Sequence, residues 1–232
     1  RQLYCSPESA DVTFIVGGKE FKVHKCILLL RAKTLLNLAE DNNGITSPIE
    51  IMNIKVNIFK TMMEYVYCIN KTPKIPGSEQ AKDLLLAADR FGCIHLKLYA
   101  ESVLVEKILA PDNCAELLLL ADSHSCALLK ESAMNMYKSD PRMAMGSKYW
   151  TMVQESNRLL TELLAHTLVS CNSSSNSVDG DIDDLDVTSL RKKLQKADLD
   201  VDGCRKILVE RLKAHVQLEA TKGGKRKRRR VE

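Results

Sequence analysis

The chain has 232 residues, of which 45% are hydrophobic and 28% charged, a profile typical of a globular protein with an ordinary core. No apolar run approaches the roughly 20 residues that a membrane-spanning helix needs, and no signal-peptide pattern opens the sequence. The net charge of +4 is uneven, because residues 221–232 hold seven Lys or Arg and one Glu, whereas residues 1–186 are net acidic. The basic end therefore favours an acidic partner, with nucleic acid as the obvious candidate.

The first residues predict a β-hairpin. Alternating apolar residues occupy residues 12–16 and again residues 21–23, with Gly17 and Gly18 between the two runs. Glycine suits such a two-residue turn because the turn requires positive φ. The chain opens with Arg1 rather than Met, which suggests a fragment, and the sequence leaves open whether a further domain precedes Arg1.

From His24 onward the pattern is mainly helical. Residues 24–40 are rich in leucine and contain neither proline nor glycine, which favours one helix. Residues 48–51 indicate a short strand, residues 55–68 a helix, and residues 72–77, with two prolines and a glycine, a loop. The pattern after Ser78 predicts helices alone, in short antiparallel hairpins: 79–92, 94–109, 112–123, 126–138 and 157–169.

The last sixty residues divide into three parts. Residues 171–186 are rich in Ser, Asn and Asp and indicate a flexible acidic linker. Residues 187–220 predict two amphipathic helices, with Leu190 and Leu194 on the first and Leu208 and Leu212 on the second. The tail, residues 221–232, is expected to be unstructured.

The N-terminal residues resemble the BTB/POZ family. The run DVTFIVGGKEFKVHKCIL and the later IFKTMMEYVY are similar to its hairpin, its His-Lys helix start and its Phe-rich helix. The helices that follow resemble BACK-type helices of speckle-type POZ adaptors. The resemblance implies a homodimer, with Asp11, His24 and Lys25 at its interface.

Residues 185–214 resemble a SAP motif, a small helical nucleic-acid binder. Helix starts offer free N–H groups to phosphates, and basic side chains flank Gly203. The nucleic-acid residues implied are Lys192, Lys193, Gly203, Arg205, Lys206 and Arg211. Lys225, Arg226, Lys227, Arg228, Arg229 and Arg230 fit a nuclear import signal, or a phosphate-binding patch without base stacking.

The sequence shows no pattern of catalytic or metal-binding residues. The stretch from Asp122 to Cys126 has nucleophile and base types, but it lacks a nucleophile-elbow context. Cys93 and His95 are the nearest approach to a metal pair, and no second pair completes four ligands. The eight cysteines form no Cys-x-x-Cys motif, so buried free thiols in a reducing compartment are expected. We therefore expect no enzyme activity, metal or cofactor.

The predicted fold class is α+β: a small mixed sheet with helices, extended by BACK-like helices, a linker and a two-helix SAP-like module. The expected boundaries are 8–107 for BTB/POZ, 108–170 for BACK-like helices, 171–186 for the linker, 187–220 for the SAP-like module and 221–232 for the tail. The sequence favours a non-enzymatic, dimerising adaptor in the nucleus, also compatible with the cytoplasm, whose basic end binds DNA or RNA in transcription or chromatin regulation.

Two alternatives stay open. One is a substrate adaptor of a cullin-type ubiquitin ligase. The likeness to BACK helices favours it, whereas the stretch EDNNGITSP lacks the hydrophobic-x-Glu motif that many cullin binders carry. The other is a self-associating scaffold whose basic end only directs import. The partners expected are thus a second copy of the chain, nucleic acid and, in the first alternative, a cullin, but no membrane.

Overall fold

The computed structural model describes residues 7–40, 48–67, 72–169 and 182–228. The chain divides into two compact units, residues 1–108 and residues 109–232.

The first unit begins with the predicted hairpin. After a short 3₁₀ turn (η2, Pro7–Ser9), β1 (Val12–Val16) pairs antiparallel with β2 (Lys19–Val23), and Phe14 lies opposite Phe21. Gly17 and Gly18 have φ of 52° and 78°, as a primed turn requires. β3 (Ile49–Glu50) pairs parallel with β1, which completes the sheet order β2-β1-β3.

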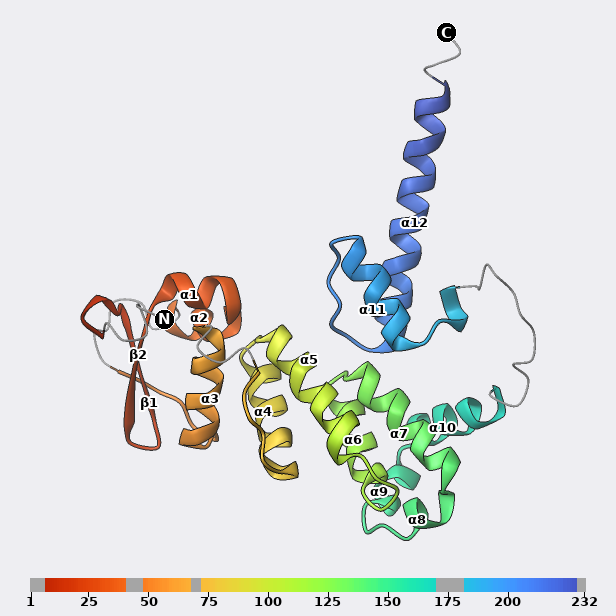
Figure 1. Cartoon of the computed structure of the whole chain (residues 1–232), viewed down its shortest axis with the longest axis horizontal. Coiled ribbons are helices and arrows are strands. Elements are labelled where there is room, and N and C mark those ends of the chain that lie inside the picture. The colour runs from red at the N-terminus through yellow and green to blue at the C-terminus, as the bar shows by residue number, and fades with distance from the viewer. Residues whose placement is uncertain (1–6, 41–47, 68–71, 170–181, 229–232) are drawn as a thin grey trace. The chain divides into compact units, whose positions relative to one another are not determined.

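The described residues of the first unit form five helices, of which α1 and α2 come between β2 and β3 in the chain and α3 lies beside the strands (Figure 1). They are α1 (Lys25–Arg31), α2 (Lys33–Glu40), α3 (Val56–Val66), α4 (Ser78–Arg90) and α5 (Ile94–Val103), and a π-helical turn, η3 (Leu104–Ile108), ends the unit. The prediction of one helix over residues 24–40 is wrong. The helix breaks at the fully buried Ala32, whose φ and ψ are −150° and 62°, so tertiary packing overrides a locally unbroken pattern.

Phe59 of α3 lies at the centre of the first core. Its ring makes edge contacts with Phe14, Phe21 and Phe91 at centroid distances of 6.2, 4.9 and 6.2 Å. Such contacts join strand, turn and helix through one aromatic cluster. On α5, Lys97 is 3% exposed, and its ammonium lies 2.8 Å from Asp89 of α4.

The second unit is helical. It contains α6 (Cys114–Ser123), α7 (Ala127–Ser139), α8 (Pro141–Met145), α9 (Trp150–Glu155) and α10 (Asn157–Val169). Tyr137 and Trp150 stack at 5.3 Å in its core. The short α8 and α9 are absent from the sequence prediction, because one to two turns give too little periodicity to detect.

The C-terminal part of this unit consists of a 3₁₀ turn, η4 (Ile182–Asp184), then α11 (Val187–Lys196) and α12 (Arg205–Arg228). The two predicted amphipathic helices are confirmed. The prediction of an unstructured tail is wrong as far as Arg228, because α12 continues through residues 221–228 without a proline to stop it.

Helix α7 supplies part of the core of this C-terminal module. Ala127 packs with Val187, Leu190 and Leu208, and Cys126 forms a backbone bridge to Gly203. Asp186 does not cap α11 with its side chain; instead Glu131 of α7 accepts a hydrogen bond from the Val187 backbone N–H at 3.0 Å. Two helices alone bury little apolar area, so the core of the module also depends on side chains from α7.

Candidate interaction surfaces

The N-terminus of α1 is held by a residue from the strand before it. Asp11 Oδ1 accepts a hydrogen bond from the Lys25 backbone N–H at 2.7 Å, whereas the N-cap residue His24 makes no capping bond of its own. A carboxylate here satisfies one of the unpaired N–H groups at the helix start and complements the helix dipole. Two of the predicted interface residues, Asp11 and Lys25, are thus brought together through the main chain of Lys25, and both are exposed in the single chain.

The third predicted interface residue, His24, is buried inside the unit at 5% exposure. The Tyr67 hydroxyl lies 2.8 Å from its backbone nitrogen and 2.9 Å from Nδ1, and Ser9 Oγ lies 2.9 Å from Nε2. Since the Tyr67 oxygen accepts from the backbone N–H, its own proton is available for Nδ1, and Nε2–H then donates to Ser9. His24 therefore fixes the start of α1 through its contacts with Tyr67 and Ser9.

Helix α1, which begins directly after His24, exposes apolar side chains. Leu28 is fully buried, but Leu29 is 54% and Leu30 77% exposed, and with the exposed Cys26 they form an i, i+3, i+4 stripe on the outer face. We call Cys26, Leu29 and Leu30 the α1 stripe. The sequence reasoning missed it, although the run Ile27–Leu30 already holds more adjacent apolar residues than one buried face of a helix can use.

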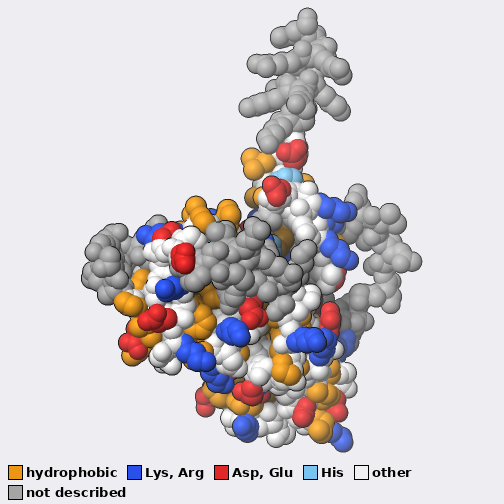
Figure 2. Space-filling model, turned by 60° about the vertical axis from the view of Figure 1, so that its left-hand side comes forward, with side chains coloured by type: hydrophobic (Ala, Val, Ile, Leu, Met, Phe, Trp, Pro, Cys, Tyr) orange, Lys and Arg blue, Asp and Glu red, His pale blue; other side chains and the backbone are white. Residues whose placement is uncertain are grey.

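Hydrophobic side chains also show elsewhere on the visible surface, in separate groups among charged ones (Figure 2). In the first unit, a groove of about 440 Å³ lies between the start of α3 and the outer face of α4. Its apolar lining includes Ile54, Ile58, Leu86 and Phe91. Lys55 and Asp83 pair at 2.6 Å on its rim, and this hydrogen bond and charge raise the pKa of Lys55.

The predicted nucleic-acid residues divide into two groups. Lys192 and Lys193 on α11 and Lys206 on α12 are exposed, and Lys206 pairs only loosely with Glu210 at 3.9 Å. These lysines offer charge to solvent, and their role in phosphate binding stays a prediction.

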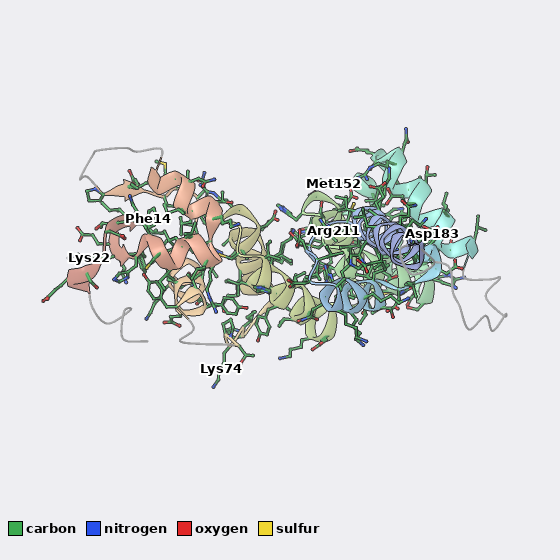
Figure 3. The ribbon with its side chains drawn as sticks, turned by 90° about the horizontal axis from the view of Figure 1, so that it is seen from above. Phe14, Lys22, Lys74, Met152, Asp183 and Arg211 are labelled. Atoms are coloured by element: carbon green, nitrogen blue, oxygen red, sulfur yellow. The ribbon has the colours of Figure 1, made fainter. Side chains whose placement is uncertain are left out.

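The arginines, in contrast, are engaged by the module itself. Arg211 donates to the Asp200 and Asp202 carbonyls at 2.5 and 3.0 Å, which holds the turn between α11 and α12. Arg205 donates to the Asp183 and Leu185 carbonyls. Asp183 and Arg211 lie on opposite sides of α12 in the view along that helix (Figure 3).

Gly203 has a conformational role in the same turn. Its φ is 125°, and an added Cβ would lie 3.3 Å from Ile207 Cγ2. The turn thus requires glycine for backbone reasons. The side chains of the predicted import signal, Lys225 to Arg230, lie outside the residues whose side chains the structure describes.

Burial controls the titration of several other groups. It raises the pKa of the Cys93 thiol to about 12, and it raises the pKa values of Cys114 and Tyr137. Burial lowers the pKa of His166 on α10, with Glu131 opposing and Lys138 and Arg205 reinforcing that shift. Among the described residues, no group of His, Cys, Asp and Glu side chains could hold a metal ion, and no helix is long and apolar enough to cross a membrane.

The model of the BTB/POZ domain family matches residues 1–108, and the hairpin, the small sheet and the helices of the first unit are consistent with a BTB/POZ domain. The chain is similar to "TD and POZ domain-containing protein 3" of Mus musculus, with 32% identity over 166 residues, which cover 71% of this chain and 45% of that protein. It is also similar to "TD and POZ domain-containing protein 4" of Mus musculus, with 33% identity over 174 residues, 73% of this chain and 46% of the relative.

The chain thus spans about half the length of the curated relatives it matches. The predicted BTB/POZ domain is confirmed, and BTB domains generally mediate protein–protein interaction and dimerisation. The BACK-like and SAP-like resemblances stay predictions.

Proposed function

We propose that this chain is a dimerising protein-interaction adaptor of the nucleus whose C-terminal module binds nucleic acid. The observation that carries the dimerisation is the α1 stripe. Leu29 and Leu30 are 54% and 77% exposed and adjacent on a helix whose start is held by Asp11 and Tyr67. Contact between these side chains and water is unfavourable, so a partner that covers them gains free energy.

A second copy of the chain suits this surface. In a two-fold arrangement the same stripe faces itself, so apolar residues meet apolar residues without a second, different surface. A stable interface buries about 800 Å² per partner, which is more than a seven-residue helix can supply. The stripe would then be the apolar centre, and exposed polar groups around it, Asp11 and Lys25 included, its rim.

The pairing is tested by mixing two copies that carry different affinity tags and purifying through one tag. We expect the second copy to be retained, and Leu30→Asp to abolish retention, because a carboxylate would be buried without a partner. Leu86→Asp on α4, at 36% exposure, is the matched control and should leave pairing intact.

Nucleic-acid binding rests on the exposed cations of the module. Lys192, Lys193 and Lys206 are accessible, and α12, which carries Lys206, continues into the predicted basic tail as far as Arg228. None of them is accompanied by an exposed aromatic residue in the module, so contacts would be made to phosphates and would be indifferent to base sequence. Such binding fits roles in transcription or chromatin regulation, and the tail would direct nuclear import.

The test is a salt series of binding to short duplex DNA by the full chain and by Lys192→Ala/Lys193→Ala. Each lost phosphate contact reduces the magnitude of the slope of log affinity against log salt by about 0.9, so the slope of the double variant should be shallower by about 1.8. Lys19→Ala/Lys22→Ala on the hairpin changes the net charge equally and should keep the original slope. Equal slopes for all three proteins would reject this module as the binding site.

A cullin-type ligase adaptor is the second candidate. The apolar groove between α3 and α4 favours it, because such a groove can receive an apolar side chain of a protein partner. Titration with a cullin N-terminal domain, comparing the native chain with Leu86→Asp, tests this role. No binding at micromolar concentrations would reject it. The scaffold alternative predicts instead that deletion of residues 222–232 abolishes import and that the full chain binds no nucleic acid.

A further inference from the structure

The segment 182–186, just before α11, lies against α12 in the module (Figure 1). Its sequence, Ile-Asp-Asp-Leu-Asp, places two apolar residues among three acidic ones. Ile182 and Leu185 are half-buried and pack against the module core, whereas Asp183 and Asp184 are exposed. We call residues 182–186 the acidic strap, since apolar side chains fasten it and acidic ones face outward.

The strap engages two cations of α12. Arg205 Nη2 donates to the carbonyl oxygens of Asp183 and Leu185 at 2.5 and 2.8 Å. Because Nη2 carries two hydrogens, these two bonds use both of them. Lys213 Nζ lies 2.5 Å from the Asp183 carboxylate.

From these contacts we propose that the acidic strap is an autoinhibitory element, which competes with phosphates for Arg205 and Lys213 and lowers the affinity of the module for polyanions. The inference rests on the nucleic-acid binding proposed above and adds a regulation to it. A carboxylate on an ammonium and carbonyls on a guanidinium occupy the same donors that a phosphate would use.

The strap attenuates binding and does not abolish it. Asp183 and Lys213 are 53% and 41% exposed, and an exposed ion pair is weak. Its loss should therefore raise polyanion affinity about two- to five-fold at low salt. Lys213, no longer paired with Asp183, would add one phosphate contact, which makes the salt slope steeper by about 0.9.

The chain supplies a matched pair of variants. Asp183→Asn removes the carboxylate that holds Lys213. Asp184→Asn changes the net charge equally at the neighbouring exposed position, which makes no ion pair within the described residues. Any general effect of one lost negative charge is common to both variants, so their difference isolates the ion pair.

The experiment measures the affinity of the native 232-residue chain, Asp183→Asn and Asp184→Asn for a short duplex DNA and for heparin across a salt series, after melting curves have shown equal folding. Tighter binding and a steeper slope for Asp183→Asn than for Asp184→Asn would support the strap. Equal affinities and slopes of the two variants, with clear binding by the wild type, would overturn the strap alone. No binding by any of the three proteins would reject the nucleic-acid function and the strap together.

Discussion

The hydroxyl of Tyr67 lies 2.8 Å from the backbone nitrogen of His24 and 2.9 Å from its Nδ1, and so joins the end of α3 to the start of α1. Both residues are buried, at 5% exposure each. The α1 stripe depends on this contact, because the contact fixes the helix that carries it.

Tyr67→Phe should destabilise the first unit by about 1–3 kcal/mol, the cost of leaving buried polar groups of His24 without their partner. Urea unfolding measures the difference. Tyr99→Phe is the matched control, since it removes only one, partly buried hydrogen bond, from the Tyr99 hydroxyl to the Pro73 carbonyl, and should cost less. A Tyr67→Phe variant as stable as Tyr99→Phe would show that the His24 contact contributes little.

Two cysteines of the first unit should differ in reactivity toward a thiol reagent. Cys26 is exposed on the α1 stripe, whereas Cys93 is 2% exposed and burial raises its pKa to about 12. Because the thiolate is the reactive form, Cys93 should be modified only on unfolding. If α1 pairs with a second copy, labelling of Cys26 should slow as protein concentration rises. Mass spectrometry of peptides identifies each site, and a concentration-independent rate at Cys26 would argue against pairing through α1.

The contact between Glu131 and the Val187 backbone N–H predicts a link between α7 and the C-terminal module. Glu131→Ala should raise the hydrogen-exchange rate of the first turn of α11, because the amide loses its acceptor. Glu116→Ala on α6 gives an acidic control in the same unit. Unchanged exchange at Val187 in Glu131→Ala would mean that the module does not depend on this cap.

The stability of the second unit should fall on acidification through His166. Burial holds the folded pKa of His166 below its ordinary value of 6.5, so the unfolded chain binds the proton more readily. The stabilising contribution is therefore complete above pH 6.5 and is lost as pH falls through the folded pKa. The groups that face His166 are Glu131 and Lys138 on α7 and Arg205 on α12. Denaturant unfolding should show that the free energy of unfolding falls less between about pH 7 and pH 5 for His166→Asn than for the native chain. An equal fall in the two proteins would show that His166 does not cause the loss of stability in acid.

Much of the first unit follows from local patterns. Gly17 and Gly18 mark the turn, and alternation in residues 12–16 defines the strand whose inner face packs on Phe59. The break at Ala32 has no local signal, since it depends on which side chains of α1 and α2 enter the core.

The sites were predicted less completely. Residue type and spacing point to cations around Gly203, but they do not show that Arg205 and Arg211 bind carbonyl oxygens of their own module. Likewise the resemblance names Asp11 and Lys25 as interface residues, but it does not show that the Asp11 carboxylate binds the Lys25 main chain within one copy. Both outcomes depend on where distant backbone groups lie, which periodicity does not encode.

Dimerisation through α1 is the central claim, and sedimentation equilibrium of the full chain tests it most directly. The account predicts a dimer mass at micromolar concentration for the native chain and for Met52→Asp, an apolar position outside α1 whose 63% exposure lies between those of Leu29 and Leu30. It predicts a folded monomer for Leu29→Asp/Leu30→Asp. A native chain that stays monomeric, or a double variant that remains a dimer, would contradict it.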